Sequence, residues 1–179
     1  RIVIVLGFVR QAMGTQNMPP TQVILGLSLF LSFFVMSPTL NKINEEALQP
    51  YIKEELSQAD ALEKGLGPLR EFMFSQVREE ELTLLTEITM KNEPVQHEDI
   101  PTMTLIPAFM LSELKRAFQM GFMIYIPFLV IDMIVSSVLM SMGMMMLPPI
   151  IISMPFKLLL FVLVDGWSLV VGSLIRSFG

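Results

Sequence analysis

Apolar residues form long runs at the two ends of this 179-residue chain, and a polar stretch separates them. Residues 1–13 and 21–40 are apolar and are joined by a polar turn that ends in Pro19 and Pro20, so residues 1–40 are predicted to form a helical hairpin. The uncharged core of the second helix, residues 23–36, is shorter than the roughly 20 residues that cross a bilayer. We therefore expect short apolar helices that pack against protein.

The polar stretch, residues 41–100, has apolar residues at helical spacing and is predicted to be an extramembrane helical segment. Its first helix is expected to break at residues 65–68, where two glycines precede Pro68, and a second helix to begin near Leu69. The second helix carries an apolar stripe that includes Phe72. We expect Phe72 to pack between neighbouring copies, and its truncation to Ala to cost about 3–5 kcal/mol if the site is fully buried.

Residues 101–179 are predicted to form a kinked helical hairpin. The outgoing helix reaches residue 147 with a bend at Pro127, and the returning helix covers residues 150–175. Because proline cannot continue a helix, Pro148 and Pro149 place the predicted tip at residues 147–149.

Composition and charge give the class of protein. The chain is 53% hydrophobic with a mean hydropathy of +0.61, which is too apolar for an ordinary soluble domain. Residues 41–100 carry fourteen acidic and six basic side chains, and the other 119 residues carry three acidic and six basic ones. An acidic block between apolar ends indicates a membrane-associated protein, and the absence of a basic stripe argues against nucleic-acid binding.

Candidate catalytic and metal-binding side chains are scarce. The chain has no cysteine, which excludes a disulfide framework. His97 is its single histidine, so a transition-metal site would lack a second nitrogen or sulfur ligand. We predict no catalytic residue, no cofactor and no metal. A membrane enzyme is the weakest functional class, because His97 has no partner for nucleophilic or acid–base chemistry.

Residues 140–149 read MSMGMMMLPP, with five methionines in seven residues beside the predicted tip. Methionine is unbranched and polarizable, so a dense group of it forms a soft apolar surface that can repack around different partners. The alternative is a lipid-facing, methionine-rich helix with a proline kink. The candidate seal residues are Met142, Gly143, Met144, Met145 and Met146.

Few charges interrupt the C-terminal apolar stretch. Asp132, Lys157 and Asp165 are the only charged residues between Ala117 and Ile175. A charge at apolar depth costs several kcal/mol unless it is paired or faces water. Counted along both arms from the predicted tip, the helical rise places Asp132 opposite Asp165. Because two carboxylates there would repel each other, they need a neighbouring cation, or one of them must bind a proton. For Lys157 we expect Glu113 as the partner. A pair within one chain requires a strong break, for which Pro127 is the candidate, and we favour the other route, a staggered neighbouring copy. We expect all four charges to be buried in the assembly.

Several segments together resemble the FliP family of flagellar biosynthetic proteins. In the C-terminal part they are IPAFMLSELKRAFQMGF (106–122), PFLVID (127–132), SVLMSMGMMMLPP (137–149), ISMPFK (152–157), LLLFVLVDGW (158–167) and GSLIRSF (172–178). Earlier segments are RQAMGTQ (10–16), PPTQVILGLSLFLSFF (19–34), ALEKG (61–65) and PLREF (68–72). The resemblance covers essentially the whole chain. Because Arg1 already lies within an apolar run, we expect further residues, with any signal peptide, upstream.

The resemblance implies an all-α subunit of the bacterial type III export gate. Such subunits assemble into a helically staggered cone with FliQ-like and FliR-like subunits, an FlhB-like subunit joins on the cytoplasmic side, and much of the complex lies on the periplasmic side of the inner membrane. The expected function is passage of unfolded flagellar export substrates, driven by a proton gradient and a separate ATPase. The methionine loop would line the constriction as a gasket.

A proton-coupled small-solute transporter is the main alternative. In that hypothesis Asp132, Lys157 and Asp165 would form a proton relay, and broken helices are common in such proteins. The chain shows no internal repeat and no polar substrate cradle at its helix breaks. The native mass of the detergent-solubilised complex would distinguish the two functions.

Overall fold

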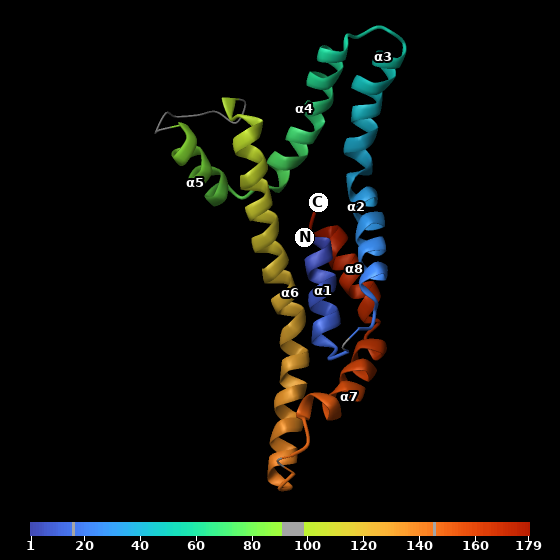
Figure 1. The fold of residues 1–179 in the computed structure, drawn as a ribbon, viewed down its shortest axis with the longest axis vertical. Helices are drawn as coiled ribbons and strands as arrows, with labels where there is room; N and C mark the ends of the chain where they lie inside the picture. The colour runs from blue at the N-terminus through green and yellow to red at the C-terminus, as the bar shows by residue number, and fades with distance from the viewer. Residues whose placement is uncertain (16, 91–98, 145) are drawn as a thin grey trace. The chain divides into compact units, whose positions relative to one another are not determined.

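The computed structural model describes residues 1–15, 17–90, 99–144 and 146–179. Every regular element in these ranges is helical, which confirms the predicted all-α class (Figure 1). The chain forms two compact units. The first contains residues 1–32 and 116–179, and the second contains residues 33–115. Helices α2 (Thr21–Ile43) and α6 (Thr102–Ser141) each contribute residues to both units.

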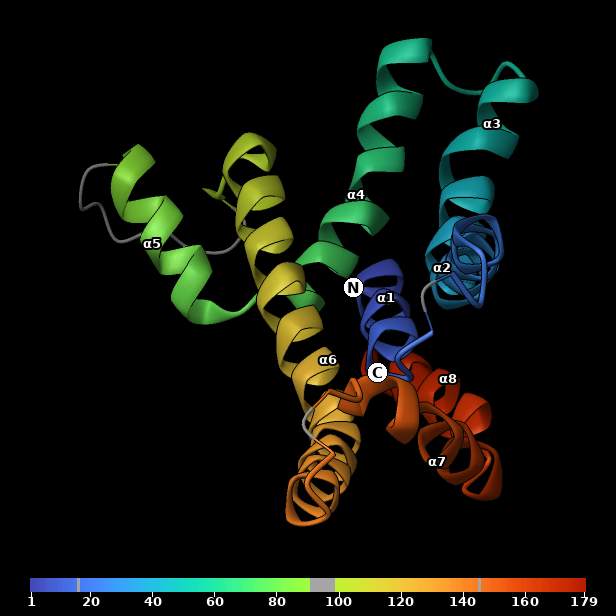
Figure 2. The same cartoon turned by 60° about the horizontal axis from the view of Figure 1, so that its bottom comes forward.

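The first unit is built around the N-terminal helix α1 (Ile2–Ala12), which lies beside the C-terminal helix α8 (Gly166–Arg176) (Figure 2). The fully buried Val5, Leu6 and Val9 of α1 pack in one hydrophobic cluster with Leu174. Helix α6 also comes close to α1, because a Cβ atom at Gly121 would lie 2.4 Å from the Phe8 ring. Only glycine fits at this contact.

The second unit contains the end of α2, the π-helix η1 (Asn44–Leu48), α3 (Gln49–Ile52), α4 (Gln58–Gln76), α5 (Glu79–Met90) and the start of α6. Its core gathers Leu82, Ile100, Leu105 and Ala108, with partly buried apolar residues of α4 and α5 against them. Arg70 supports this core from α4, because its guanidinium donates hydrogen bonds to Ile100 O at 2.8 Å and to Thr102 Oγ1 at 2.6 Å.

The apolar helices are longer than the sequence predicted. Two of them, Thr21–Ile52 and Thr102–Ser141, are long and apolar enough to cross a membrane, and a third span is possible if α7 (Pro149–Leu163) and α8 count as one bent pair. The expectation of a short second helix was wrong, because the helix continues through Pro38 and through the first charged residues into η1 and α3.

Helix breaks also differ from the prediction at two places. Helix α4 runs through residues 65–68 with Pro68 buried inside it, and it begins earlier, where Ser57 Oγ accepts a hydrogen bond from the Asp60 amide. Helix α6 is continuous past Pro127, as predicted, and the bend expected there stays a prediction. The returning helix, by contrast, is broken into α7 and α8, which meet at an angle of 64°.

Candidate functional site

Helix α6 ends at Ser141, six residues before its predicted end at residue 147, so the tip of the C-terminal hairpin begins earlier than predicted. Gly143 has a φ angle of +74°, and its amide donates to Met140 O at 3.0 Å. The next amide, of Met144, donates to Leu139 O at 3.0 Å. These two hydrogen bonds and the left-handed glycine form a Schellman motif, which satisfies the last carbonyls of a helix. Gly143 therefore serves as the C-terminal cap of α6.

This cap places the methionines in a turn beyond the helix. Met142, Met144 and Met146 are exposed by 61%, 41% and 97%, respectively. The fourth methionine predicted for the seal, Met145, lies outside the described residues. Pro149 is the first residue of α7, where the absent amide proton of proline has no consequence.

Behind the tip, α6 and α7 are joined by a buried ion pair. Lys157 Nζ lies 2.6 Å from Asp132 Oδ2, and the exposed fractions of the two side chains are 3% and 23%. Ser153 Oγ donates a hydrogen bond to the other carboxylate oxygen of Asp132. Both charges of this pair are therefore neutralised within one chain.

The length of each hairpin arm explains why these residues meet. Asp132 lies nine residues before Ser141, the end of α6, and Lys157 lies eight residues after Pro149, the start of α7. At about 1.5 Å per residue the two side chains lie at similar distances from the tip. Gly14 approaches the same pair, since a Cβ atom at Gly14 would lie 3.7 Å from Lys157 Nζ.

The structure corrects the expected partners of the buried charges. Lys157 pairs with Asp132 of its own chain, where the sequence analysis expected Glu113 of a neighbour; the error came from placing the tip too late in the sequence. Asp165 lies at the break between α7 and α8 with a φ angle of +50° and is exposed, so it does not face Asp132 from inside a helix. Glu113 is buried in the second unit. The burial of Asp165 in an assembly stays a prediction.

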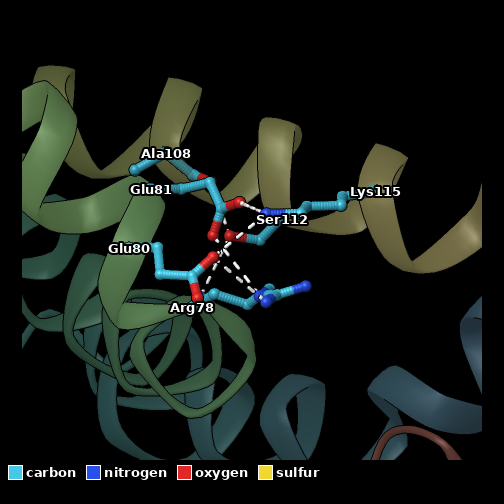
Figure 3. Close-up of polar contacts among 6 residues, drawn as sticks. All are labelled: Arg78, Glu80, Glu81, Ala108, Ser112 and Lys115. Carbon is cyan, nitrogen blue, oxygen red and sulfur yellow. Dashed lines mark hydrogen bonds and ion pairs between the residues drawn. The ribbon is translucent and has the colours of Figure 1, made fainter.

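A second polar group, which was not predicted from the sequence, joins α5 to α6 in the other unit. Figure 3 shows this α5–α6 charge cluster, formed by Arg78, Glu80, Glu81, Ser112 and Lys115. Lys115 Nζ lies 3.0 Å from Glu80 Oε2 and 3.0 Å from Glu81 Oε1. The Arg78 amide donates to Ser112 Oγ at 3.0 Å, and Ser112 Oγ donates to Ala108 O at 2.9 Å.

Glu81 is the buried member of the α5–α6 charge cluster. Its side chain is 10% exposed, and Oε2 lies 3.6 Å from Arg78 Nε without accepting a hydrogen bond from the described residues. The hydrogen bond from Lys115 holds the pKa of the Glu81 carboxyl below its ordinary value of 4.5, against the opposing effect of burial. The cluster therefore holds α5 against α6 with an ionised carboxylate.

Phe72 is half-buried in the single chain. Its ring packs edge-on against Phe109 of α6, with ring centroids 6.0 Å apart. Part of the ring stays available for another surface, so its predicted role between copies stays a prediction. Among the described residues, no group of three or more His, Cys, Asp or Glu side chains could hold a metal ion.

The long apolar helices, the buried ion pair behind a hairpin tip and the exposed thioethers at that tip together define an all-helical protein whose helices are long and apolar enough to cross a membrane. The chain belongs to the FliP family, whose model matches residues 1–174. It is 57% identical to the flagellar biosynthetic protein FliP of Bacillus subtilis over 178 residues, which cover 99% of this chain and 80% of that protein.

Two further relatives give similar matches. The FliP of Pectobacterium carotovorum is 55% identical over 178 residues, which cover 99% of this chain and 69% of that protein. The FliP of Aquifex aeolicus is 51% identical over 180 residues, which cover 99% of this chain and 75% of that protein.

Proposed function

We propose that this protein is a structural, pore-forming subunit of the type III protein export gate of the bacterial flagellum, in the inner membrane. Membership of the FliP family and the apolar helices support a membrane component of flagellar biosynthesis. The observation that carries the pore-forming role is the exposure of the thioethers of Met142, Met144 and Met146, which lie beyond the end of a capped helix.

The chemistry of the tip suits a seal that must open for varied sequences. A thioether side chain has three rotatable bonds and no strong hydrogen-bonding group, so it repacks at low cost around an unfolded polypeptide. Several copies of the tip, brought together in a ring, would exclude water and ions when no polypeptide is present. The left-handed Gly143 ends α6, so the turn would begin at the same residue in each copy.

The rest of the chain would support this ring. The Asp132–Lys157 pair braces the two arms behind the tip, and a direct, paired contact of this kind suits a structural role. Phe72, Glu113 and Asp165 are proposed to contact further copies or FliQ-like and FliR-like subunits, with an FlhB-like subunit beside them. Membrane lipid would cover the remaining apolar faces, and the mass outside the bilayer would lie in the periplasm as part of the basal body.

Conductance measurements with matched variants test the seal. Replacing Met142, Met144 and Met146 together by Ala removes most of the apolar volume of these three side chains from the proposed seal. Cells that express the variant gate should therefore leak ions and small solutes. Replacing the same residues by Leu keeps the apolar volume and should keep the membrane tight. Unchanged conductance of the Ala variant, with normal expression and assembly, would rule out the seal.

A further inference from the structure

Each arm of the C-terminal hairpin contains a weak point behind the buried ion pair. On α6 it is Pro127, which has no amide proton, so the helix lacks the hydrogen bond that would join residue 127 to residue 123. On the returning arm it is the 64° break between α7 and α8, at Asp165. The Phe128 ring of α6 is buried against Phe161, which lies four residues before Asp165, with ring centroids 6.2 Å apart. The two weak points therefore lie across from each other.

The break between α7 and α8 depends on two adjacent residues with different requirements. Asp165 has a φ angle of +50°, in the left-handed region that residues with a side chain avoid. At Gly166, which follows it, a Cβ atom would lie 2.4 Å from the Phe161 ring. The same ring packs edge-on against Trp167 of α8, with ring centroids 5.2 Å apart. The bent backbone is thus strained at Asp165 and is held by the packing of Phe161 against the start of α8.

The part of the hairpin beyond these two points is braced internally. We call residues 128–141 of α6, together with α7, the distal arm. The ion pair between Asp132 and Lys157 joins the two helices of the distal arm, with the charged atoms 2.6 Å apart. Helix α8 is held elsewhere, because Leu174 packs in one hydrophobic cluster with α1. A change in the angle between the distal arm and α8 would therefore take place at the two weak points.

We propose that Pro127 and the Asp165–Gly166 break form a hinge, on which the distal arm turns and carries the methionine tip with it. In the bent state the Phe161 ring lies against Gly166 and holds the hinge. When α7 and α8 become collinear, Asp165 takes ordinary helical angles and the ring leaves Gly166. The step from this movement to opening of an export path rests on the proposed function.

Spin labels on α7 and α8 measure the bend directly, because the chain has no cysteine of its own. Ile151→Cys and Ser173→Cys place the labels at two exposed sites. At about 1.5 Å per residue, the two Cα atoms would lie about 33 Å apart in a straight helix and about 28 Å apart with a 64° bend at Asp165. Pulsed electron paramagnetic resonance of the full protein, diluted with unlabelled copies, measures the distance within one chain. The wild type should show mainly the shorter distance.

Substitutions at the break should shift this distance in opposite directions. Gly166→Ala should move most chains to the longer distance, because its methyl group would occupy the place of the Phe161 ring in the bent state. Asp165→Ala should at least double the fraction at the longer distance without touching the ring, because alanine avoids the left-handed region more than aspartate does. Asp165→Gly should leave only the shorter distance. The control is Gly172→Ala in α8, where a Cβ atom has room and the distance should not change.

The outcomes separate the hinge from the seal. An unchanged distance in Gly166→Ala and in Asp165→Ala, with unchanged helical content by circular dichroism, would overturn the hinge. A shift of the same size in Gly172→Ala would overturn it as well, because any alanine in α8 would then have the effect. Cells that express Gly166→Ala should also leak ions, and a longer distance without a leak would overturn control of the seal by the hinge. Failure of the seal itself would appear in the methionine-to-alanine variant, whose label distance should stay short.

Discussion

At the residue scale, Gly143 decides where the hairpin turns. A residue with a side chain pays roughly 1–2 kcal/mol to adopt the left-handed conformation that Gly143 has. Nothing lies within 4 Å of a Cβ atom added at Gly143, so the cost of substitution comes from the backbone and not from a clash. The position of the methionine turn therefore depends on one backbone conformation.

Gly143→Ala should lower the free energy of unfolding by about 1 kcal/mol, because alanine is strained at the φ angle of the cap. Chemical denaturation in detergent, followed by circular dichroism, measures this change. Gly7→Ala is the matched control: Gly7 lies inside α1 with free space around it, so alanine there should be neutral or stabilising. Equal stability of the two variants would show that the cap contributes nothing.

Replacing only one member of the Asp132–Lys157 pair should be costly. Lys157→Met leaves a largely buried carboxylate without its cation, and breaking such a pair typically costs about 3–5 kcal/mol. The double variant Asp132→Leu with Lys157→Met should recover most of that loss, because it leaves no unpaired charge. A double-mutant cycle from denaturation curves measures the coupling, with Lys64→Met at an exposed site as the control. Additive single effects would contradict the pairing.

The sequence indicated only some features of the ion pair and the methionine tip. The need of Lys157 for a partner, and the density of methionines, could be predicted from the sequence. The partner could not, because the prediction used Pro148 as the end of the helix while Gly143 ended it first. A glycine a few residues before a proline pair is a C-cap signal, and giving it more weight would have brought Asp132 opposite Lys157.

At the element scale, the α5–α6 charge cluster fixes a short helix to a long one. Helix α5 has twelve residues and is too short to be stable alone in water. Its core contact is Leu82, which packs with Leu105 and Ala108 of α6, and the ion pairs of Lys115 lie beside that contact. The exposed pair with Glu80 contributes little, so the buried Glu81 is the important member.

Lowering the pH should weaken the contact of α5 with α6. The folded pKa of Glu81 is lowered, so its contribution is complete above about pH 4.5 and is lost as the pH falls through the folded pKa. The protection of the α5 amides against hydrogen exchange in the full protein, relative to the intrinsic exchange rate at each pH, should therefore fall below pH 4.5. Glu81→Gln should make α5 exchange fast at neutral pH as well, whereas Glu79→Gln, at an exposed site in the same turn, should not. Identical protection in both variants would contradict this role.

Element type was easier to predict than element length. The spacing of apolar residues gave helices throughout, as observed. The break predicted at residues 65–68 did not occur, because the hydrogen bond at Ser57 starts α4 upstream and the packing of Gly65 against Ala47 suits a continuous helix. The break at Asp165 was missed because the apolar run around it outweighed the turn signal of the Asp-Gly pair at residues 165–166.

At the scale of the whole molecule, we propose that one exposed turn contacts a polypeptide during its passage. Much of the apolar surface of the single chain is exposed, including large side chains of α2, α6 and α7, and such a surface needs lipid or other subunits to cover it. The proposed ring of hairpin tips is one arrangement that covers it and brings the methionines together.

Cross-linking of a substrate in transit tests the central claim most directly. The chain has no cysteine, so Met146→Cys introduces a single thiol at the most exposed residue of the tip. An export substrate that carries one cysteine and is stalled by a folded C-terminal domain should form a disulfide with this variant under mild oxidation. Asp60→Cys, at an exposed site on α4, is the control and should give no adduct. A stalled substrate that links to the control but never to the tip would contradict the proposal that residues 142–147 line the export path.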